Sequence, residues 1–246
     1  MFAVKRITHS RHNHQKHKTP PAMKTPSEPS SAHTTKRIEA RFVRKIEQFR
    51  NDEIRLVMLD RVESHSVACV NWEEYPYAPK VMFRVAHSDN ALAVMFEVEE
   101  EHLRGVATSV EQNVWEDSCV ELFIESPLGD GYFNFEVNCI GTMLAAHRQS
   151  RTEATLFNAD KMAQIRHFGS LQRAPIDSRG AGQKWWMVEV IPFSLLGIDK
   201  PPKSLRCNFY KCGDKCDRPH FLSWSPIDKP EPNFHCPEFF GEVILV

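Results

Sequence analysis

The sequence predicts an all-β protein, an antiparallel β-sandwich of the immunoglobulin or jelly-roll-like type with a few short helices. Many segments alternate apolar and polar residues with period two between turn-forming residues, which is typical of strands. These strands do not alternate with long helices, so a parallel βαβ sheet is disfavoured. The 16 Phe and 5 Trp among 246 residues favour β structure, and the 16 Pro fit loops and strand ends.

The chain divides into a predicted disordered basic tail, residues 1–37, and a β-sandwich domain, residues 38–246. The tail holds eight Lys/Arg against one Glu and has little apolar surface to offset the entropy of ordering. The formal net charge of the whole chain is −1. We therefore expect neither nucleic acid nor a membrane as a partner, since no charge field would attract them.

The seven Cys are odd in number and lack the regular spacing of a disulfide scaffold, which indicates reduced thiols. The first residues lack the apolar core of a secretory signal, and no apolar run is long enough to span a membrane. On these grounds we expect a cytoplasmic protein.

The first elements of the sandwich are two hairpins. Residues 81–100 form two apolar runs separated by the turn formers Ser88, Asp89 and Asn90. Residues 119–125 and 132–139 predict a second hairpin across the turn SPLGDG, and residues 141–148 extend its sheet.

The later elements are a short helix and three strands. Residues 158–168 predict the helix, with Asn158 or Asp160 as its cap. Residues 184–197 predict a strand that ends in a helical turn begun by a proline. The last two strands are expected at residues 204–212 and 239–246.

The strand predicted at residues 132–139 has two unlike faces, because successive side chains of a strand point to opposite sides. One face is apolar and should line the core: Phe133, Phe135, Val137 and Cys139. The other carries Tyr132, Asn134, Glu136 and Asn138. Asn is disfavoured in strands, and amides and carboxylates suit sugar hydroxyls, which donate and accept together. The polar row indicates a carbohydrate site or, alternatively, a hydrogen-bond network that braces the sheet.

A carbohydrate site also needs flat aromatic side chains, because sugar rings present apolar C–H faces. Trp115 precedes the second hairpin, and Trp224 lies near the C-terminus in HFLSWSPI. Both are expected near loops and are candidate stacking residues. The alternative is that each indole packs in the core.

Three blocks of the sequence, VWEDSCVELFIE…YFNFEVNCIGTML, NFYKCGD…PHFLSWSPI and PNFHCPEFFGEVIL, resemble bacterial carbohydrate-binding family 9-like domains. The resemblance runs from about Trp72 to Val246 and implies one β-sandwich that binds a mono- or oligosaccharide, with a role in carbohydrate catabolism. In the sugar-binding members two Trp enclose a sugar, and Glu, Asn and Arg hold its hydroxyls. By this resemblance the ligand-binding residues are Trp115, Glu121, Asn138, Arg148, Asn208, Lys211 and Trp224.

Two rival hypotheses concern metal binding and catalysis. Cys212, Cys216, His220 and His235 could converge on zinc, but Gly213 and Pro219 break any helix and the spacing is not that of a zinc finger, so we predict no metal and no cofactor.

A hydrolase would use Glu121, Glu125 and Glu136 as acid and base, since paired strands bring carboxyls close. Nothing in the sequence marks one of them as a proton donor, so we predict a non-catalytic protein. The alternatives are a structural or interaction sandwich without a sugar ligand, and an accessory domain of a glycan-processing hydrolase. The sequence leaves the sugar and the oligomeric state open.

Overall fold

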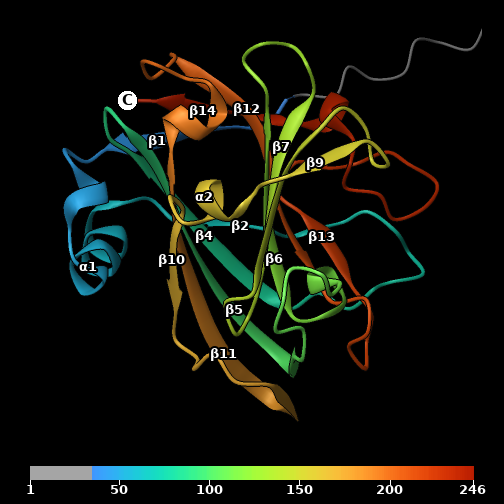
Figure 1. The fold of residues 1–246 in the computed structure, drawn as a ribbon. Coiled ribbons are helices and arrows are strands. Elements are labelled where there is room, and N and C mark those ends of the chain that lie inside the picture. Colours follow the sequence, from blue (N-terminus) through green and yellow to red (C-terminus); the bar gives the residue numbers. More distant parts are fainter. Residues whose placement is uncertain (1–34) are drawn as a thin grey trace, which may run out of the picture. The chain divides into compact units, whose positions relative to one another are not determined.

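The computed structural model describes residues 35–246, and the predicted tail lies outside the described residues except for its last three positions. The regular structure of the described chain is mainly strand, and the strands pack as two layers, which confirms the predicted β-sandwich (Figure 1). Both predicted hairpins are present, and their strands begin and end within one residue of the expected positions or extend beyond them.

The first layer has the strand order β10-β11-β5-β4, and β2 pairs with the edge of β4 that faces away from β5. All of these pairs are antiparallel. The strands span β2 (His65–Ser66), β4 (Lys80–His87), β5 (Ala91–Gly105), β10 (Arg166–Gly169) and β11 (Ile176–Pro192).

The second layer has the order β14-β12-β6-β7-β8-β9 and carries the predicted polar face. Two short strands extend this sheet: β13 pairs with the end of β12 on the edge away from β6, and β3 pairs with β13. The strands span β3 (Cys69–Val70), β6 (Cys119–Glu125), β7 (Tyr132–Asn138), β8 (Met143–Arg148), β9 (Ala154–Leu156), β12 (Ser204–Cys212), β13 (Phe221–Ser223) and β14 (Gly241–Leu245).

The strand β1 (Arg37–Phe42) joins the two layers. Its first four residues pair with β14 and its last two with β4, in both cases parallel. The sandwich is therefore antiparallel within each layer and parallel only at this seam.

The helices are short and lie outside the two layers. The helix α1 (Asn51–Arg61) buries Ile54 and Met58 against the outer face of the first layer (Figure 1). The helix predicted at residues 158–168 is only the single turn α2 (Ala159–Met162), and residues 166–168 belong to β10 instead. Asn158 caps the turn, and its side chain accepts from the Lys161 amide. The remaining turns are η1 (Ile46–Gln48), η2 (Val114–Glu116), η3 (Phe193–Leu196) and η4 (Pro237–Phe239). Among residues 35–246 no helix has the length and apolar character needed to cross a membrane.

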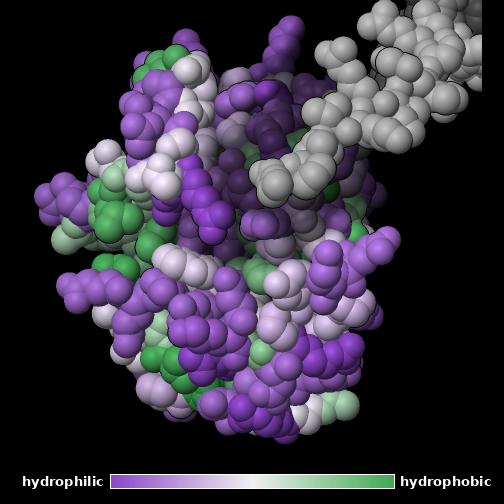
Figure 2. Space-filling model, turned by 90° about the vertical axis from the view of Figure 1, so that its right-hand side faces the viewer, coloured by the Kyte–Doolittle hydropathy of each residue, from purple (hydrophilic) through white to green (hydrophobic). Residues whose placement is uncertain are grey.

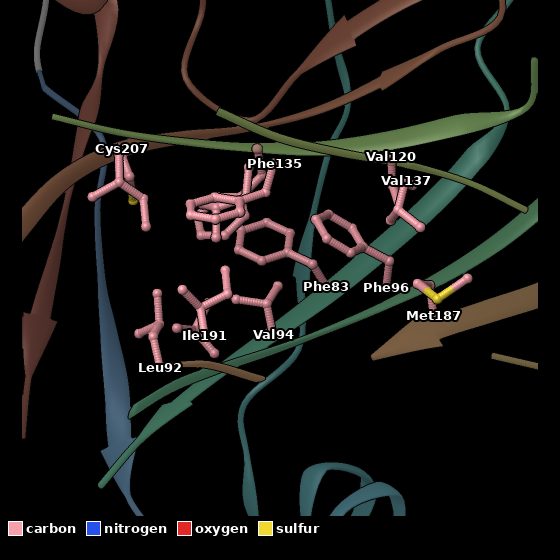
Figure 3. Packing of buried hydrophobic residues seen from close by; sticks show 14 of the residues in the cluster. Phe83, Leu92, Val94, Phe96, Val120, Phe135, Val137, Met187, Ile191 and Cys207 are labelled. Carbon is pink, nitrogen blue, oxygen red and sulfur yellow. The ribbon is translucent and has the colours of Figure 1, made fainter. Parts of the chain in front are cut away.

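The main core fills the space between the layers (Figure 3). Phe135 and Val137 of β7 point inward toward Phe83 of β4 and Phe96 of β5, as the period-two pattern predicts. The Phe83 ring stacks on Phe209 of β12 with centroids 4.1 Å apart.

A second, smaller core lies on the opposite face of the β7-β6-β12 sheet. Here Tyr132, Phe123 and Tyr210 meet Phe234 and Phe240 from the chain between β13 and the C-terminus. The Tyr210 and Phe234 rings stack with centroids 4.2 Å apart. The outer face of this layer is therefore largely covered by the C-terminal segment, and only part of the polar row reaches a pocket.

Candidate functional site

The candidate site is a pocket at the edge of the small core, over the outer face of β6, β7 and β12. Its cavity volume is about 240 Å³, below the roughly 300–1,000 Å³ of pockets for drug-sized ligands. We call it the Trp115 pocket. Its lining residues are Trp115, Glu121, Glu136, Arg148, Arg151, Cys212, Asp214, Phe221, Pro232, Asn233, Phe234 and His235.

Trp115 brings a partly buried indole to this pocket from the turn η2. Two contacts to the end of β12 fix that turn. The Cys212 thiol lies 3.4 Å from the Trp115 carbonyl, and the Asp214 amide donates to the same oxygen. The turn that carries the indole is thus fixed to the end of β12.

Two carboxyl groups form the floor of the pocket. Glu121 of β6 and Glu136 of β7 are directly opposed in the strand register, and each is 3% exposed. Burial and the neighbouring Glu136 raise the pKa of Glu121 well above its ordinary value. Burial also raises the pKa of Glu136 to about 7, although Arg148 partly offsets the shift. Both acids therefore hold protons to a higher pH than exposed glutamates do.

Amide and guanidinium groups hold one side of this pair. The Asn134 side-chain amide donates to Glu136 Oε1 over 2.5 Å. Arg148 Nε in turn donates to Asn134 Oδ1 over 2.9 Å. Glu136 Oε2 has no hydrogen-bond partner among the residues that the structure describes. One polar atom of the floor is therefore without a protein partner.

The rim of the pocket comes from residues far along the chain. His235 lies with Nδ1 2.8 Å from the Tyr132 hydroxyl, and burial lowers the pKa of His235 to about 3. Its ring is therefore neutral at ordinary pH. Asp214, on the turn after β12, has its pKa raised to about 6, mainly by burial. Figure 2 views the side of the molecule on which β9, β13 and the C-terminal segment lie, and hydrophilic residues dominate that surface.

Residues 51–245 match the model of the family described as Carbohydrate-binding family 9. The chain belongs to this family. A candidate carbohydrate-binding protein from Bacteroides uniformis ATCC 8492 is 33% identical, with a TM-score of 0.81 over 87% of this chain and 100% of the other. No curated protein matches the chain.

Two further solved structures are family 9 carbohydrate-binding modules from Caldicellulosiruptor kristjanssonii. One, in complex with glucose, is 16% identical, with a TM-score of 0.57 over 86% of this chain and 96% of the other. The other, in complex with cellotriose, is also 16% identical, with a TM-score of 0.56 over 85% and 93%. At this identity the likeness shows a shared fold.

The seven residues expected to bind ligand in this family 9 chain divide into two sets. Trp115, Glu121 and Arg148 line one pocket together. The remaining four lie elsewhere and are almost completely buried: Asn138, Asn208, Lys211 and Trp224.

Trp224 does not form a second stacking plate, which corrects the expectation drawn from the sequence. It is 2% exposed and packs in the main core with edge contacts to Phe83 and Phe209. An indole enclosed in this way has no free face for a sugar ring. The alternative interpretation of Trp224, core packing, is the one that the structure shows.

The two asparagines brace loops instead of lining the pocket. The Asn138 side chain donates to the Ala107 carbonyl and to Asp117 Oδ2, both over 2.9 Å. The Asn208 amide donates to the Ser225 carbonyl over 3.0 Å and accepts from the Ser225 amide over 2.8 Å. Both side chains are completely buried and hydrogen-bonded to these loops, so neither faces the pocket.

Lys211 lies on the opposite face of β12 and points between the layers. Its ammonium is 3.0 Å from Glu100 Oε2 and 2.7 Å from His220 Nε2, and Lys211 is completely buried. Its place in the strand explains this, because Lys211 shares the parity of the core residues Cys207 and Phe209.

The four groups considered for zinc do not converge. Cys212 faces the Trp115 pocket and His235 is on its rim. Cys216 and His220 line a separate pocket with His102 and Tyr77. The Lys211 ammonium beside His220 would also repel a cation there.

Sequence reasoning did not assign the rim to the site. Arg151, Asp214, Phe221, Phe234 and His235 lie in loops or at strand ends without a periodic pattern. The run PNFHCPEFF, with three aromatic residues and a histidine in a loop, was the available signal.

Proposed function

We propose that this chain binds a carbohydrate in the Trp115 pocket and does not cleave it. One observation carries the proposal: a partly buried indole lines the same pocket as two buried carboxyls and a guanidinium. An aromatic face attracts the C–H side of a sugar ring. The carboxyl and guanidinium groups offer the acceptors and donors that sugar hydroxyls need.

The size of the pocket suits one sugar ring better than a long chain. A cavity of about 240 Å³ accepts a terminal residue of a glycan, and the rest of the chain would extend past the exposed Arg151. The glucose and cellotriose bound by the Caldicellulosiruptor kristjanssonii modules support a neutral glucose-type sugar as the first ligand to test.

The carboxyl pair supports binding over hydrolysis. Glycoside hydrolases use one carboxylic acid and one ionised carboxylate, so their environments push the two pKa values apart. Here burial raises the pKa of both Glu121 and Glu136. Both acids can therefore act as hydrogen-bond partners of sugar hydroxyls.

Isothermal titration calorimetry with glucose and cellotriose tests the proposal on the full chain and on Trp115→Ala. Losing the stacking indole should cost about 1.5–3 kcal/mol, or roughly ten- to a hundredfold in affinity. Trp186→Ala is the matched control. Trp186 of β11, in the other layer, is also a partly buried indole, and its ring centroid lies 4.9 Å from the Arg55 guanidinium. It does not line the Trp115 pocket.

Three results would decide against the proposal. Equal losses in both tryptophan variants would move the site away from Trp115. No binding of these sugars or of any member of a glycan array would favour a structural or interaction sandwich. Release of reducing sugar from cello-oligosaccharides, absent in Glu136→Gln, would establish hydrolysis.

A further inference from the structure

A cluster of three metal-ligating side chains lies beneath the Trp115 pocket. One ligand atom each from Cys119, Glu121 and Cys212 lies within 4.8 Å of the other two, and all three residues are buried. Strand register produces the cluster, because Cys119 and Cys212 are directly opposed on β6 and β12. Glu121 follows Cys119 by two positions and so points to the same face.

The cluster is already in contact through hydrogen bonds. The Cys212 thiol donates to Glu121 Oε1 over 3.0 Å. A tetrahedral zinc site, with Zn–S of about 2.3 Å and Zn–O of about 2.1 Å, separates its ligand atoms by roughly 3.4–3.8 Å. Closing from 4.8 Å or less to that separation needs only small side-chain rotations.

A second observation points to a missing partner at the carboxyl next to this cluster. Glu136, opposed to Glu121 in the register, has a buried Oε2 atom without a hydrogen-bond partner in the described part of the chain. The Arg148 guanidinium does not fill this role, because its hydrogen bonds go to Asn134 and to the Arg151 carbonyl. An unpartnered buried carboxyl oxygen is costly unless something binds it.

We propose that Cys119, Cys212 and Glu121, with Glu136 as the fourth donor, bind a thiophilic divalent cation of the Zn²⁺ type. Two thiolates with carboxylate oxygens suit a borderline-soft ion with tetrahedral preference, and do not suit calcium or magnesium, which take oxygen ligands. The ion enters through the Trp115 pocket, which Glu121, Glu136 and Cys212 line. Metal binding replaces the two thiol protons and any proton held by the two carboxyls, and these protons pass to solvent.

This site differs from the one that the cysteine spacing suggested. That spacing grouped Cys212 with Cys216 and His220, which lie on the far side of β12 beside the Lys211 ammonium. The cysteine beside Cys212 is instead Cys119 of β6, which lies 93 positions earlier in the chain. No local sequence motif can show such a pair. The inference does not depend on sugar binding.

Cobalt is the probe, because Co²⁺ bound by thiolate absorbs in the near ultraviolet. The full chain is reduced, depleted of metal with a chelator and titrated with Co²⁺ alone. We expect a thiolate-to-cobalt band that saturates at one Co²⁺ per chain and disappears when Zn²⁺ is added. The five histidines of residues 1–37 give no such band with Co²⁺, since they carry no thiolate.

Variants assign the ligands. Cys119→Ser and Cys212→Ser should each abolish the band, and Glu121→Gln should weaken Co²⁺ binding at least tenfold. Cys216→Ser is the matched control and should keep it, because this buried cysteine lies outside the cluster. Should a serine variant fail to fold, as judged by circular dichroism, Glu121→Gln and Glu136→Gln still test the site.

The proposal fails if the reduced protein shows no thiolate band at a tenfold excess of Co²⁺. It also fails if the band survives in Cys119→Ser and Cys212→Ser, or if Glu121→Gln binds Co²⁺ as tightly as the parent. Isolation of the protein with a Cys119–Cys212 disulfide that forms again in air, together with no metal binding after reduction, would replace the metal site by a redox pair.

Discussion

Glu189 of β11 is a carboxyl placed inside the main core, and its burial makes a quantitative prediction. Glu189 lies two positions from each of the core residues Met187 and Ile191, so its side chain points to the same face of β11. The side chain is completely buried. Neither of its carboxyl oxygens has a hydrogen-bond partner among residues 35–246. Burial raises the pKa of Glu189 to about 8 from an ordinary value of 4.5. Its neighbour across the strand pair, His167, is partly buried, and this burial lowers the pKa of His167.

The sign of the pH effect follows from which state holds the proton. Below pH 4.5 the Glu189 side chain is protonated in both the folded and the unfolded state. Its ionisation therefore does not lower the free energy of unfolding in this range. Between pH 4.5 and about 8 the unfolded chain has released the proton and the folded chain still holds it. Stability then falls as pH rises, by about 1.4 kcal/mol per pH unit, on the order of 5 kcal/mol across the window.

Replacing Glu189 by Gln removes this dependence while keeping the shape of the side chain. Urea unfolding at pH 5.5, 6.5 and 7.5 gives the free energy of unfolding of the parent and the variant. The variant should gain about 3 kcal/mol relative to the parent between pH 5.5 and 7.5. The titrations of Glu121 and Glu136 occur in both proteins and cancel in the difference.

Glu39→Gln is the control, since Glu39 is exposed on β1. Its difference from the parent should stay nearly constant over the same range. A Glu189→Gln difference that is equally flat from pH 5.5 to 7.5 would refute the buried neutral acid.

Three further substitutions follow from the packing. Trp224→Ala should lower the free energy of unfolding by about 3–5 kcal/mol in urea, while calorimetry on the folded protein shows unchanged sugar affinity. Lys211→Met leaves Glu100 as an unpaired buried charge and should lower the free energy of unfolding in urea by about 3–5 kcal/mol. The double variant Lys211→Met with Glu100→Leu should recover most of this loss. Gly131→Ala places a Cβ against the Arg148 carbonyl at φ +119°, so thermal melting should show a loss of about 1–3 kcal/mol and calorimetry a weaker sugar affinity.

The layers of the fold could be predicted because period-two alternation is a local signal. The strand from Ser204 to Cys212 and the hairpin around Ser88 match the structure for this reason. The helix α1 escaped prediction because its buried side is narrow, with only Ile54 and Met58 buried, and Leu56 is 54% exposed. Such a helix resembles a polar loop in sequence.

The site could be predicted only where one strand face determined it. Alternation places Glu121 on the face that reaches the pocket, and applied strictly it also places Lys211 in the core. Lys211 was expected at the site because of the resemblance to sugar-binding modules, although its position in the strand points its side chain to the core. Trp224 follows β13 directly, and nothing local distinguishes an indole that folds inward from one at a pocket wall.

The outer face of the β7-β6-β12 sheet explains why a ligand is expected at all. Most of that face is closed by aromatic residues of the C-terminal segment, which stabilise the protein by burial. Under the Trp115 pocket the same closure leaves Glu121 and Glu136 buried with an unpartnered oxygen, an arrangement that lowers stability. Folding alone would favour apolar residues at these two positions. Retaining acids there is reasonable when a bound group, a sugar hydroxyl or a cation, supplies the missing partner and returns the free energy on binding.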